Sequence, residues 1–255
     1  MKQVQNKNRH YSSICLLAKN ENDYINEWLD WHLNKLKFNH IYIYDNESKI
    51  PIETSIEDKY KDRVTINRWT KRDYRGIMQV CCYSHFLNNY GRDNKWTAFI
   101  DADEFIRLID DIDINSFLSQ YEDCDGIYIE WLMYNANGQY KKEEGLVRDR
   151  FTTYTEYKNK PWNGKSIVKP HTVKIMGAHT PRAYHRRLKL VYSNKEFINE
   201  EKNDAPLDKI VIDHYFTKSY EEWCEKLARG SCNTLIRKIE EFFLFNPDMN
   251  PKEVK

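Results

Sequence analysis

Apolar positions along the first half of the chain fall into two patterns, helical spacing and short continuous runs. Residues recurring at helical spacing predict helices at Ile25–Leu36 and Ile77–Tyr90. Short runs rich in β-branched and aromatic residues predict buried strands at Ser12–Ala18, His40–Tyr44, Arg63–Trp69 and Trp96–Ile100. Strands that alternate with helices in this way predict an α/β fold, in which helices cover both faces of a largely parallel sheet.

The second half loses this regular alternation. Residues 125–133 form one further apolar run, whereas residues 141–165 are charged and broken by Gly145, Pro161 and Gly164. Ser219 to Glu222 matches a capping box, which predicts the start of a helix. Short strands are predicted at Ser166–Lys169, Thr172–Met176, Leu188–Tyr192 and Lys209–Ile212.

The chain shows no repeat and no linker long enough to separate domains. We expect a polar N-terminal extension at 1–11, a single domain at 12–245 and a tail at 246–255. Within the domain, the regular part ends near residue 105, the irregular part runs from about 106 to 230, and an amphipathic helix closes it at 231–245.

Composition narrows the functional classes. The 255 residues are 40% hydrophobic and 31% charged, so a packed core is expected. A formal net charge of +1 gives no electrostatic reason to expect a nucleic acid partner. No apolar run approaches the ~20 residues of a membrane span, and the six cysteines lack zinc-like spacing. We expect reduced thiols and a cytoplasmic protein, with peripheral membrane association left open.

The acidic motif Asp101-Ala102-Asp103 directly follows the strand predicted at 96–100. Carboxylates at i and i+2 beyond a strand end suit a hard divalent cation that keeps positions for phosphate oxygens. The alternative is an acidic turn that caps a helix. Glu21 and Asp45 also lie just past predicted strand ends, and parallel sheets bind ligands at that edge.

Several further segments stand out together with this motif: Lys19-Asn20-Glu21, Tyr24-Ile25-x-Glu27-Trp28-Leu29-x-x-His32, His40 through Asp45-Asn46-x-Ser48, Gln79 with Tyr83 and His85, Trp131 with Gly138, Lys165 to Pro170, His179-x-Pro181, and His214 through Lys218-Ser219 to Lys226-x-x-Arg229-Gly230. As a set, over roughly residues 12–231, they resemble glycosyltransferases of the family 2-like and family 92 group. The resemblance implies a GT-A (Rossmann-like) fold with a mixed sheet, helices on both faces and a smaller, irregular β-containing C-terminal region for the acceptor.

The resemblance also implies a nucleoside-diphosphate-sugar donor, with UDP-sugar favoured, and a divalent metal, Mn²⁺ or Mg²⁺. A metal that bridges the two phosphates would neutralise the charge of the leaving group. Asp103 is the expected direct ligand, and Asp101 is expected to reach the ribose or the metal through water. His214 could complete the metal shell; His179 is the alternative, and either could equally be a hydrogen-bonded structural histidine.

Donor contacts are also expected from residues outside the acidic motif. Asp45 fits a base or ribose contact; the alternative is a turn-forming Asx residue, and both roles can hold at once. Glu21 fits a nucleotide contact or a solvated loop carboxylate. Arg75 and Gln79 could meet the base or the pyrophosphate, with a surface ion pair as the alternative for Arg75. Lys218 could hold the diphosphate.

Lys226 and Arg229 share the expectation made for Lys218, the alternative being a solvated basic helix face. An inverting transferase also needs a carboxylate to accept the proton of the acceptor hydroxyl. Glu130 and Asp213 are the two candidates, and the sequence does not choose between them.

The sequence therefore predicts a metal-dependent, inverting glycosyltransferase that acts on a glycan, glycolipid or glycoprotein. One alternative is a degenerate transferase that binds sugar or nucleotide without turnover, which the presence of both motif carboxylates disfavours. Another is a nucleotidyltransferase, which would normally carry a glycine-rich loop after its first strand. Lys19-Asn20-Glu21-Asn22 contains no glycine.

Overall fold

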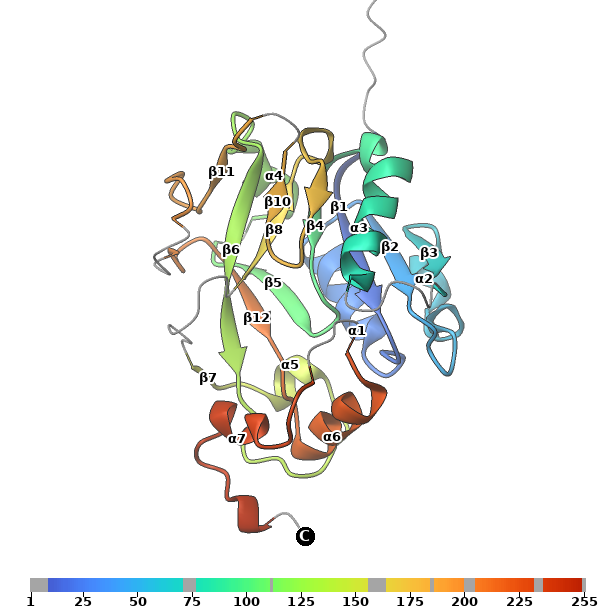
Figure 1. The fold of residues 1–255 in the computed structure, drawn as a ribbon, viewed down its shortest axis with the longest axis vertical. Helices are drawn as coiled ribbons and strands as arrows, with labels where there is room; N and C mark the ends of the chain where they lie inside the picture. Colours follow the sequence, from blue (N-terminus) through green and yellow to red (C-terminus); the bar gives the residue numbers. More distant parts are fainter. Residues whose placement is uncertain are drawn as a thin grey trace, which may run out of the picture.

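The structure is a computed structural model that describes residues 9–70, 77–110, 112–155, 164–183, 186–199, 205–231 and 236–253. Its strands are β1 His10–Ala18, β2 His40–Asp45, β3 Val64–Arg68, β4 Asn94–Phe99, β5 Glu104–Leu108, β6 Gly126–Tyr134, β7 Tyr154–Thr155, β8 Gly164–Val168, β9 Ile175–Met176, β10 Pro181–Arg182, β11 Leu190–Val191 and β12 Ile210–His214 (Figure 1).

The α-helices are α1 Ile25–Leu29, α2 Asp58–Lys61, α3 Met78–Asn89, α4 Ile114–Ser119, α5 Val147–Arg150, α6 Tyr220–Arg229 and α7 Glu241–Phe245. A π-helical stretch, Asp30–Lys35, continues α1. Short 3₁₀ turns occupy Ile52–Ser55, Gly91–Asp93, Pro170–Thr172 and Pro251–Glu253.

One mixed sheet organises the described residues, with the strand order β3-β2-β1-β4-β8-β6-β12-β5. The strands β3, β2, β1 and β4 are parallel, as the alternating pattern predicts. β8 runs antiparallel to both β4 and β6, and β12 is parallel to β6 but antiparallel to β5. The predicted α/β class with a mixed sheet is confirmed.

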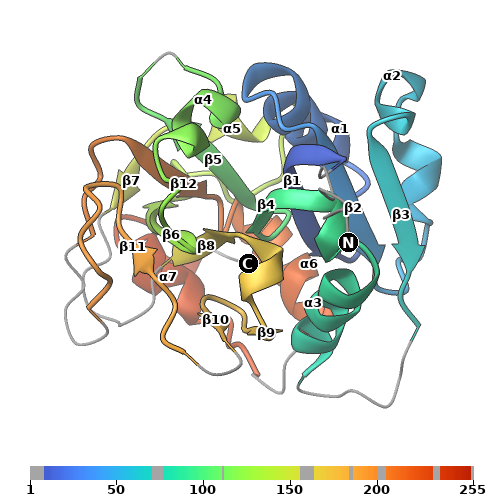
Figure 2. The same cartoon turned by 90° about the horizontal axis from the view of Figure 1, so that it is seen from above.

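Helices cover both faces of the parallel strands because successive side chains of a strand point to opposite faces. On β1, Ile14 and Leu16 pack in the core that receives α1, whereas Cys15 packs in a second core with Cys82 and Phe86 of α3. Figure 2 shows α1 and α3 on opposite sides of the sheet. This packing fixes the sheet edge at which the strands end.

The C-terminal segment differs from the expected long helix. The capping box at Ser219 and Glu222 is present and begins α6. Of the helix predicted at 231–245, the described part is helical only from Glu241 to Phe245. Asn246 ends this helix, because its side-chain amide donates to the Phe242 carbonyl at 2.8 Å while its side-chain oxygen accepts from the backbone N–H of Ala136. The segment is thereby attached to the end of β6.

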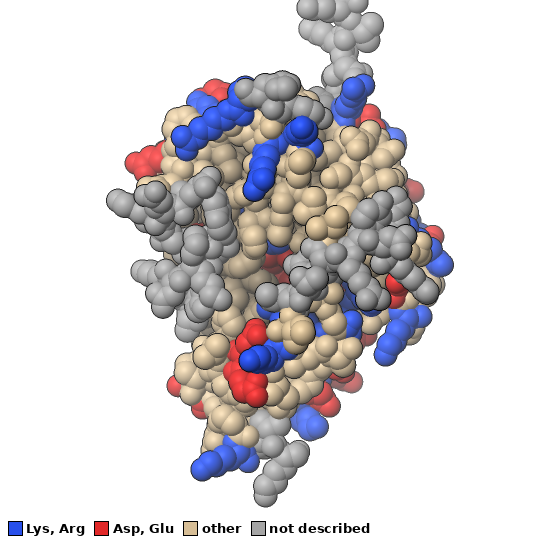
Figure 3. All heavy atoms as spheres, in the orientation of Figure 1, with Lys and Arg blue, Asp and Glu red and all other residues tan. Residues whose placement is uncertain are grey.

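Lys, Arg, Asp and Glu side chains are interspersed on the face shown in Figure 3, in agreement with the net charge of +1. Among the residues that the structure describes, no helix has the length and apolar character needed to cross a membrane.

Candidate active site

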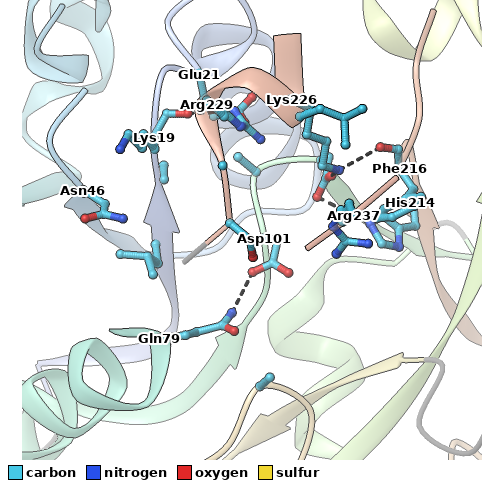
Figure 4. A pocket seen from close by; sticks show the side chains of 18 of the residues that line it. Lys19, Glu21, Asn46, Gln79, Asp101, His214, Phe216, Lys226, Arg229 and Arg237 are labelled. Atoms are coloured by element: carbon cyan, nitrogen blue, oxygen red, sulfur yellow. Dashed lines mark hydrogen bonds and ion pairs between the residues drawn. The ribbon is translucent and has the colours of Figure 1, made fainter. Parts of the chain in front are cut away.

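A cavity of about 590 Å³ opens where β1, β4 and β12 end, and α6 and the C-terminal segment form its other side. Figure 4 shows charged side chains from these separate elements converging on it. Its lining consists of Leu17, Ala18, Lys19, Glu21, Asn46, Gln79, Asp101, Ala102, Asp103, Trp131, Met133, Lys165, Ala178, His179, His214, Phe216, Lys226, Leu227, Arg229, Gly230, Ser231, Ile236, Arg237 and Phe245.

Asp101 begins the turn between β4 and β5 and is held on three sides. Lys165 Nζ donates to its Oδ2 at 2.7 Å, and Gln79 Nε2 donates to its Oδ1 at 2.9 Å. The backbone N–H of Asp101 donates to Glu104 Oε2 at 2.8 Å. The last bond fixes the turn, so that the carboxylate of Asp101 faces the cavity while that of Glu104 lies beneath it.

Lys165 and Glu104 form the buried base of this arrangement. The side chain of Lys165 is 2% exposed, and its ammonium also donates to the Ala178 carbonyl at 3.1 Å and lies 3.8 Å from Glu104 Oε1. Burial raises the pKa of the fully buried Glu104 well above its usual range, and Lys165 acts against that rise. Although burial acts in the opposite direction, Asp101 and Glu104 raise the pKa of Lys165. Lys165 therefore remains a cation under the acidic motif.

Asp103 faces two groups from the C-terminal half. Lys226 Nζ donates to its Oδ2 at 2.6 Å, and His214 Nε2 lies 3.5 Å from its Oδ1. Although burial acts in the opposite direction, Lys226 and His214 hold the pKa of Asp103 well below its usual range. The carboxylate is thus ionised in a nearly enclosed place.

His214 lies at the end of β12, in register with Met133 of β6 and Glu104 of β5. Its ring lies tilted against that of Trp131, with ring centroids 4.5 Å apart. Burial lowers the pKa of His214. Its Nδ1 is buried and has no hydrogen-bond partner among the residues described. The close approach to Asp103, across more than a hundred residues of sequence, is as predicted.

A second charged group lies at the end of β1. Arg229 forms an ion pair with Glu21 and donates to the Lys19 carbonyl at 2.8 Å, which ties the end of α6 to the loop after β1. Lys218 Nζ is 3.8 Å from the other oxygen of Glu21, but Lys218 does not line the cavity. Glu21 is therefore a buried, paired carboxylate rather than a solvated one.

The structure does not bring every expected residue to the cavity. Asp45 accepts from the backbone N–H groups of Ser48 at 3.1 Å and Ile52 at 3.0 Å, so it is a turn-forming residue beside the site. Arg75 lies outside the described residues. Glu130 is buried on β6 and does not line the cavity, because its neighbour Trp131 occupies the cavity face of the strand.

Asp213 is also directed away from the cavity. It lies next to His214 on β12, and adjacent strand residues point to opposite faces. Its two carboxylate oxygens accept from Arg107 Nε at 2.8 Å and Arg107 Nη2 at 2.9 Å. Neither carboxylate considered for the proton acceptor thus touches the cavity in this conformation.

Sequence reasoning included Lys165 in a matched segment without giving it a role, and it assigned Lys226 no partner. Lys165 is the second residue of the short strand β8, and a buried lysine there needs an anion. A lysine at the start of a buried strand was the available signal. His179 also lines the cavity, and its Nδ1 lies 2.8 Å from the Gly164 carbonyl oxygen. Arg237, from the C-terminal segment, lies with its guanidinium 4.5 Å from the centroid of the Phe216 ring.

The donor types at this site fit a divalent cation. Asp103 and His214 offer an oxygen and a nitrogen side by side, and Asp101 offers a second carboxylate. In the described part of the chain, no three His, Cys, Asp or Glu side chains already converge on one point. One or two carboxylates can hold Mg²⁺ or a similar ion when substrate phosphates complete its shell.

Comparison with known proteins places the chain in a family. The model of "Glycosyltransferase family 92" matches residues 10–241. A search of curated proteins gives no match. Similar solved structures include a mannosyltransferase from Pyrobaculum calidifontis in complex with GDP-Man and Mn²⁺, at 15% identity, with 49% of this chain and 36% of that chain covered and a TM-score of 0.35.

Glucosyl-3-phosphoglycerate synthase from Mycobacterium tuberculosis, in complex with Mn²⁺, UDP and glucosyl-3-phosphoglycerate, is 12% identical over 64% of this chain and 58% of that chain, with a TM-score of 0.35. A putative glucose-1-phosphate thymidylyltransferase from Bacillus anthracis is 13% identical over 63% and 69%, with a TM-score of 0.32. The chain spans about a third to two thirds of the length of these proteins, and the likeness is too distant to assign a donor. The family match, which extends over nearly the whole chain, is decisive: the chain belongs to glycosyltransferase family 92.

Proposed function

We propose that this glycosyltransferase moves a sugar from a nucleoside-diphosphate sugar, a UDP-sugar in the first instance, to a hydroxyl of a glycan, glycolipid or glycoprotein. The observation that carries the proposal is the placement of Asp101 and Asp103 at one edge of the cavity, together with lysine cations from two other elements, β8 and α6. Paired carboxylates with adjacent cations suit a ligand that is itself a metal-bound polyanion.

In the proposed reaction, the diphosphate leaves with developing negative charge. A bound Mn²⁺ or Mg²⁺ would act as a Lewis acid on the phosphate oxygens. Asp103 and His214 would hold the ion, and Asp101, fixed by Lys165, would reach the ribose or the metal through water. Lys226 and Arg229 would face the phosphates from α6, where a helix end meets the cavity.

Inversion requires a proton acceptor for the attacking hydroxyl, and for this role we favour His179 over Glu130 and Asp213. A carbonyl oxygen can only accept a hydrogen bond, so the contact with Gly164 places the ring proton on Nδ1 and leaves a lone pair on Nε2. Burial lowers the pKa of His179 to about 4, so the ring is neutral at pH 7. Its ring makes an edge-on contact with the ring of Trp131, with centroids 5.3 Å apart, and both rings line the cavity.

A donor screen tests this function. Release of free nucleotide is measured with UDP-, GDP- and CMP-sugars in the presence of Mn²⁺, with a mixed glycan acceptor pool and with water alone. We expect turnover with at least one nucleoside-diphosphate sugar and its loss in EDTA. Pyrophosphate release from a nucleoside triphosphate and a sugar phosphate would instead identify a nucleotidyltransferase. Tight nucleotide binding with no release from any sugar donor would identify a non-catalytic binding protein.

A further inference from the structure

The two carboxylates of the acidic motif are each bonded to a lysine, but the two lysines are held differently. Lys165 is 2% exposed and is the second residue of β8, with a second bond to the Ala178 carbonyl. Lys226 is 18% exposed, lies on α6 and lines the cavity. The bond of Lys165 to Asp101 is therefore part of the core, whereas Lys226 borders the space that a ligand would enter.

The Lys226 side chain has further contacts that can hold it when its ammonium leaves Asp103. Its Nζ also donates to the Phe216 carbonyl at 2.7 Å, and it lies 4.2 Å from the centroid of the Phe216 ring and 5.9 Å from that of Trp223. Long lysine stems commonly pack along apolar surface while their charged ends move. A shift of the ammonium away from Asp103 can thus occur without displacing α6.

A divalent cation on Asp103 would compete directly with Lys226. Metal–oxygen bonds are ~2 Å long, and Lys226 Nζ is 2.6 Å from Oδ2, so an ion bound to that oxygen would lie no more than about 5 Å from the ammonium. Three positive charges would then share one carboxylate in a buried place. A diphosphate removes this conflict, because its negative charge can receive the ammonium while its oxygens complete the metal shell.

We propose that Lys226 occupies the place of the metal on Asp103 in the donor-free protein and transfers to the diphosphate when the donor arrives, so that metal and nucleotide bind as one coupled event. This inference rests on the proposed function and adds that the metal does not bind before the nucleotide, because the protein without nucleotide excludes the metal. By linkage, each of the two ligands must raise the affinity for the other by the same factor.

The test uses the full chain and direct binding rather than turnover. Mn²⁺ binding is followed by electron paramagnetic resonance of the free ion, and UDP and GDP binding by calorimetry, each with and without the other ligand. Lys226→Met removes the charge and keeps a stem of similar length. Lys226→Arg keeps the charge. Lys95→Met is the matched control, since Lys95 forms an ion pair of 2.7 Å with Glu122 remote from the cavity.

For the wild type, the arginine variant and the Lys95 variant, we expect weak Mn²⁺ binding that strengthens at least tenfold when nucleotide is added. For Lys226→Met, we expect Mn²⁺ alone to bind at least tenfold more tightly than to the wild type, while nucleotide binding in Mn²⁺ weakens. A role in folding alone would not tighten metal binding.

Equal Mn²⁺ affinity of wild type and Lys226→Met without nucleotide would overturn the coupling while leaving the proposed function intact, provided that wild type binds nucleotide with metal. If Lys226→Met does not fold, the test is Mn²⁺ binding to the wild type with and without nucleotide. A Mn²⁺ affinity that nucleotide does not change would overturn the coupling. If wild type binds neither UDP nor GDP in Mn²⁺, the proposed function fails, and the coupling fails with it.

Discussion

Lys165 gives the clearest quantitative prediction. Lys165→Met removes the cation that lies between Asp101, at 2.7 Å, and Glu104, at 3.8 Å. At an effective dielectric constant of about 20, unit charges 2.7 Å apart attract by about 6 kcal/mol before desolvation is counted. Removing one partner of a buried pair costs about 3–5 kcal/mol. Because the Asp101 side chain is 34% exposed, water screens it, and we expect the lower end, about 3 kcal/mol.

Urea unfolding and thermal melting measure this loss. For a chain of this size, about 3 kcal/mol corresponds to a fall in Tm of roughly 6–9 °C. Lys95→Met is the control, because its partly exposed ion pair with Glu122 should contribute no more than about 1 kcal/mol. A Lys165→Met protein whose free energy of unfolding lies within about 1 kcal/mol of the Lys95→Met value would refute the reasoning.

The stability lost in Lys165→Met should also depend on pH, because Glu104 titrates. Its pKa is raised in the folded protein, so its stabilising contribution is complete below the ordinary value of 4.5 and disappears as pH rises through the folded pKa. Removing Lys165 removes the cation that opposes this rise. The deficit in the free energy of unfolding should therefore be larger at pH 8 than at pH 5, and Glu104→Gln in the Lys165→Met background should remove this dependence. A deficit that shrinks with rising pH would contradict the assignment.

Three further variants test the site. Asp103→Asn should lower turnover at least about a hundredfold, through loss of several kcal/mol of transition-state stabilisation, with the fold intact by circular dichroism; undiminished activity would remove Asp103 from the site. Asp213→Asn should lower the Tm, because Arg107 loses its bidentate partner, but should retain transfer; abolished transfer in a stable protein would restore Asp213 as the base. His179→Gln should lower kcat at least about tenfold with donor affinity unchanged, and an unaltered kcat would exclude His179 as the proton acceptor.

Local sequence pattern determined the elements that depend on local chemistry. Short apolar runs rich in β-branched and aromatic residues predicted β1, β2, β3 and β4, and apolar residues at helical spacing predicted α1 and α3, because both patterns are set by local burial. The capping box at Ser219 and Glu222 begins α6 as expected. Asp101 and Asp103 reach the cavity because they follow the end of a buried strand.

The sequence did not determine the features that depend on which face of a strand a side chain occupies and on which distant residue it contacts. Glu130 and Asp213 were plausible bases by residue type, but each is next to a cavity-lining residue on its strand and so points the other way. Lys165 and Lys226 lie 64 and 123 residues from the carboxylates that they neutralise, and only the packing of β8 and α6 against the β4 end joins them. Local pattern carries no information on such long-range pairs, because the energy that selects them arises only when burial brings the charges together.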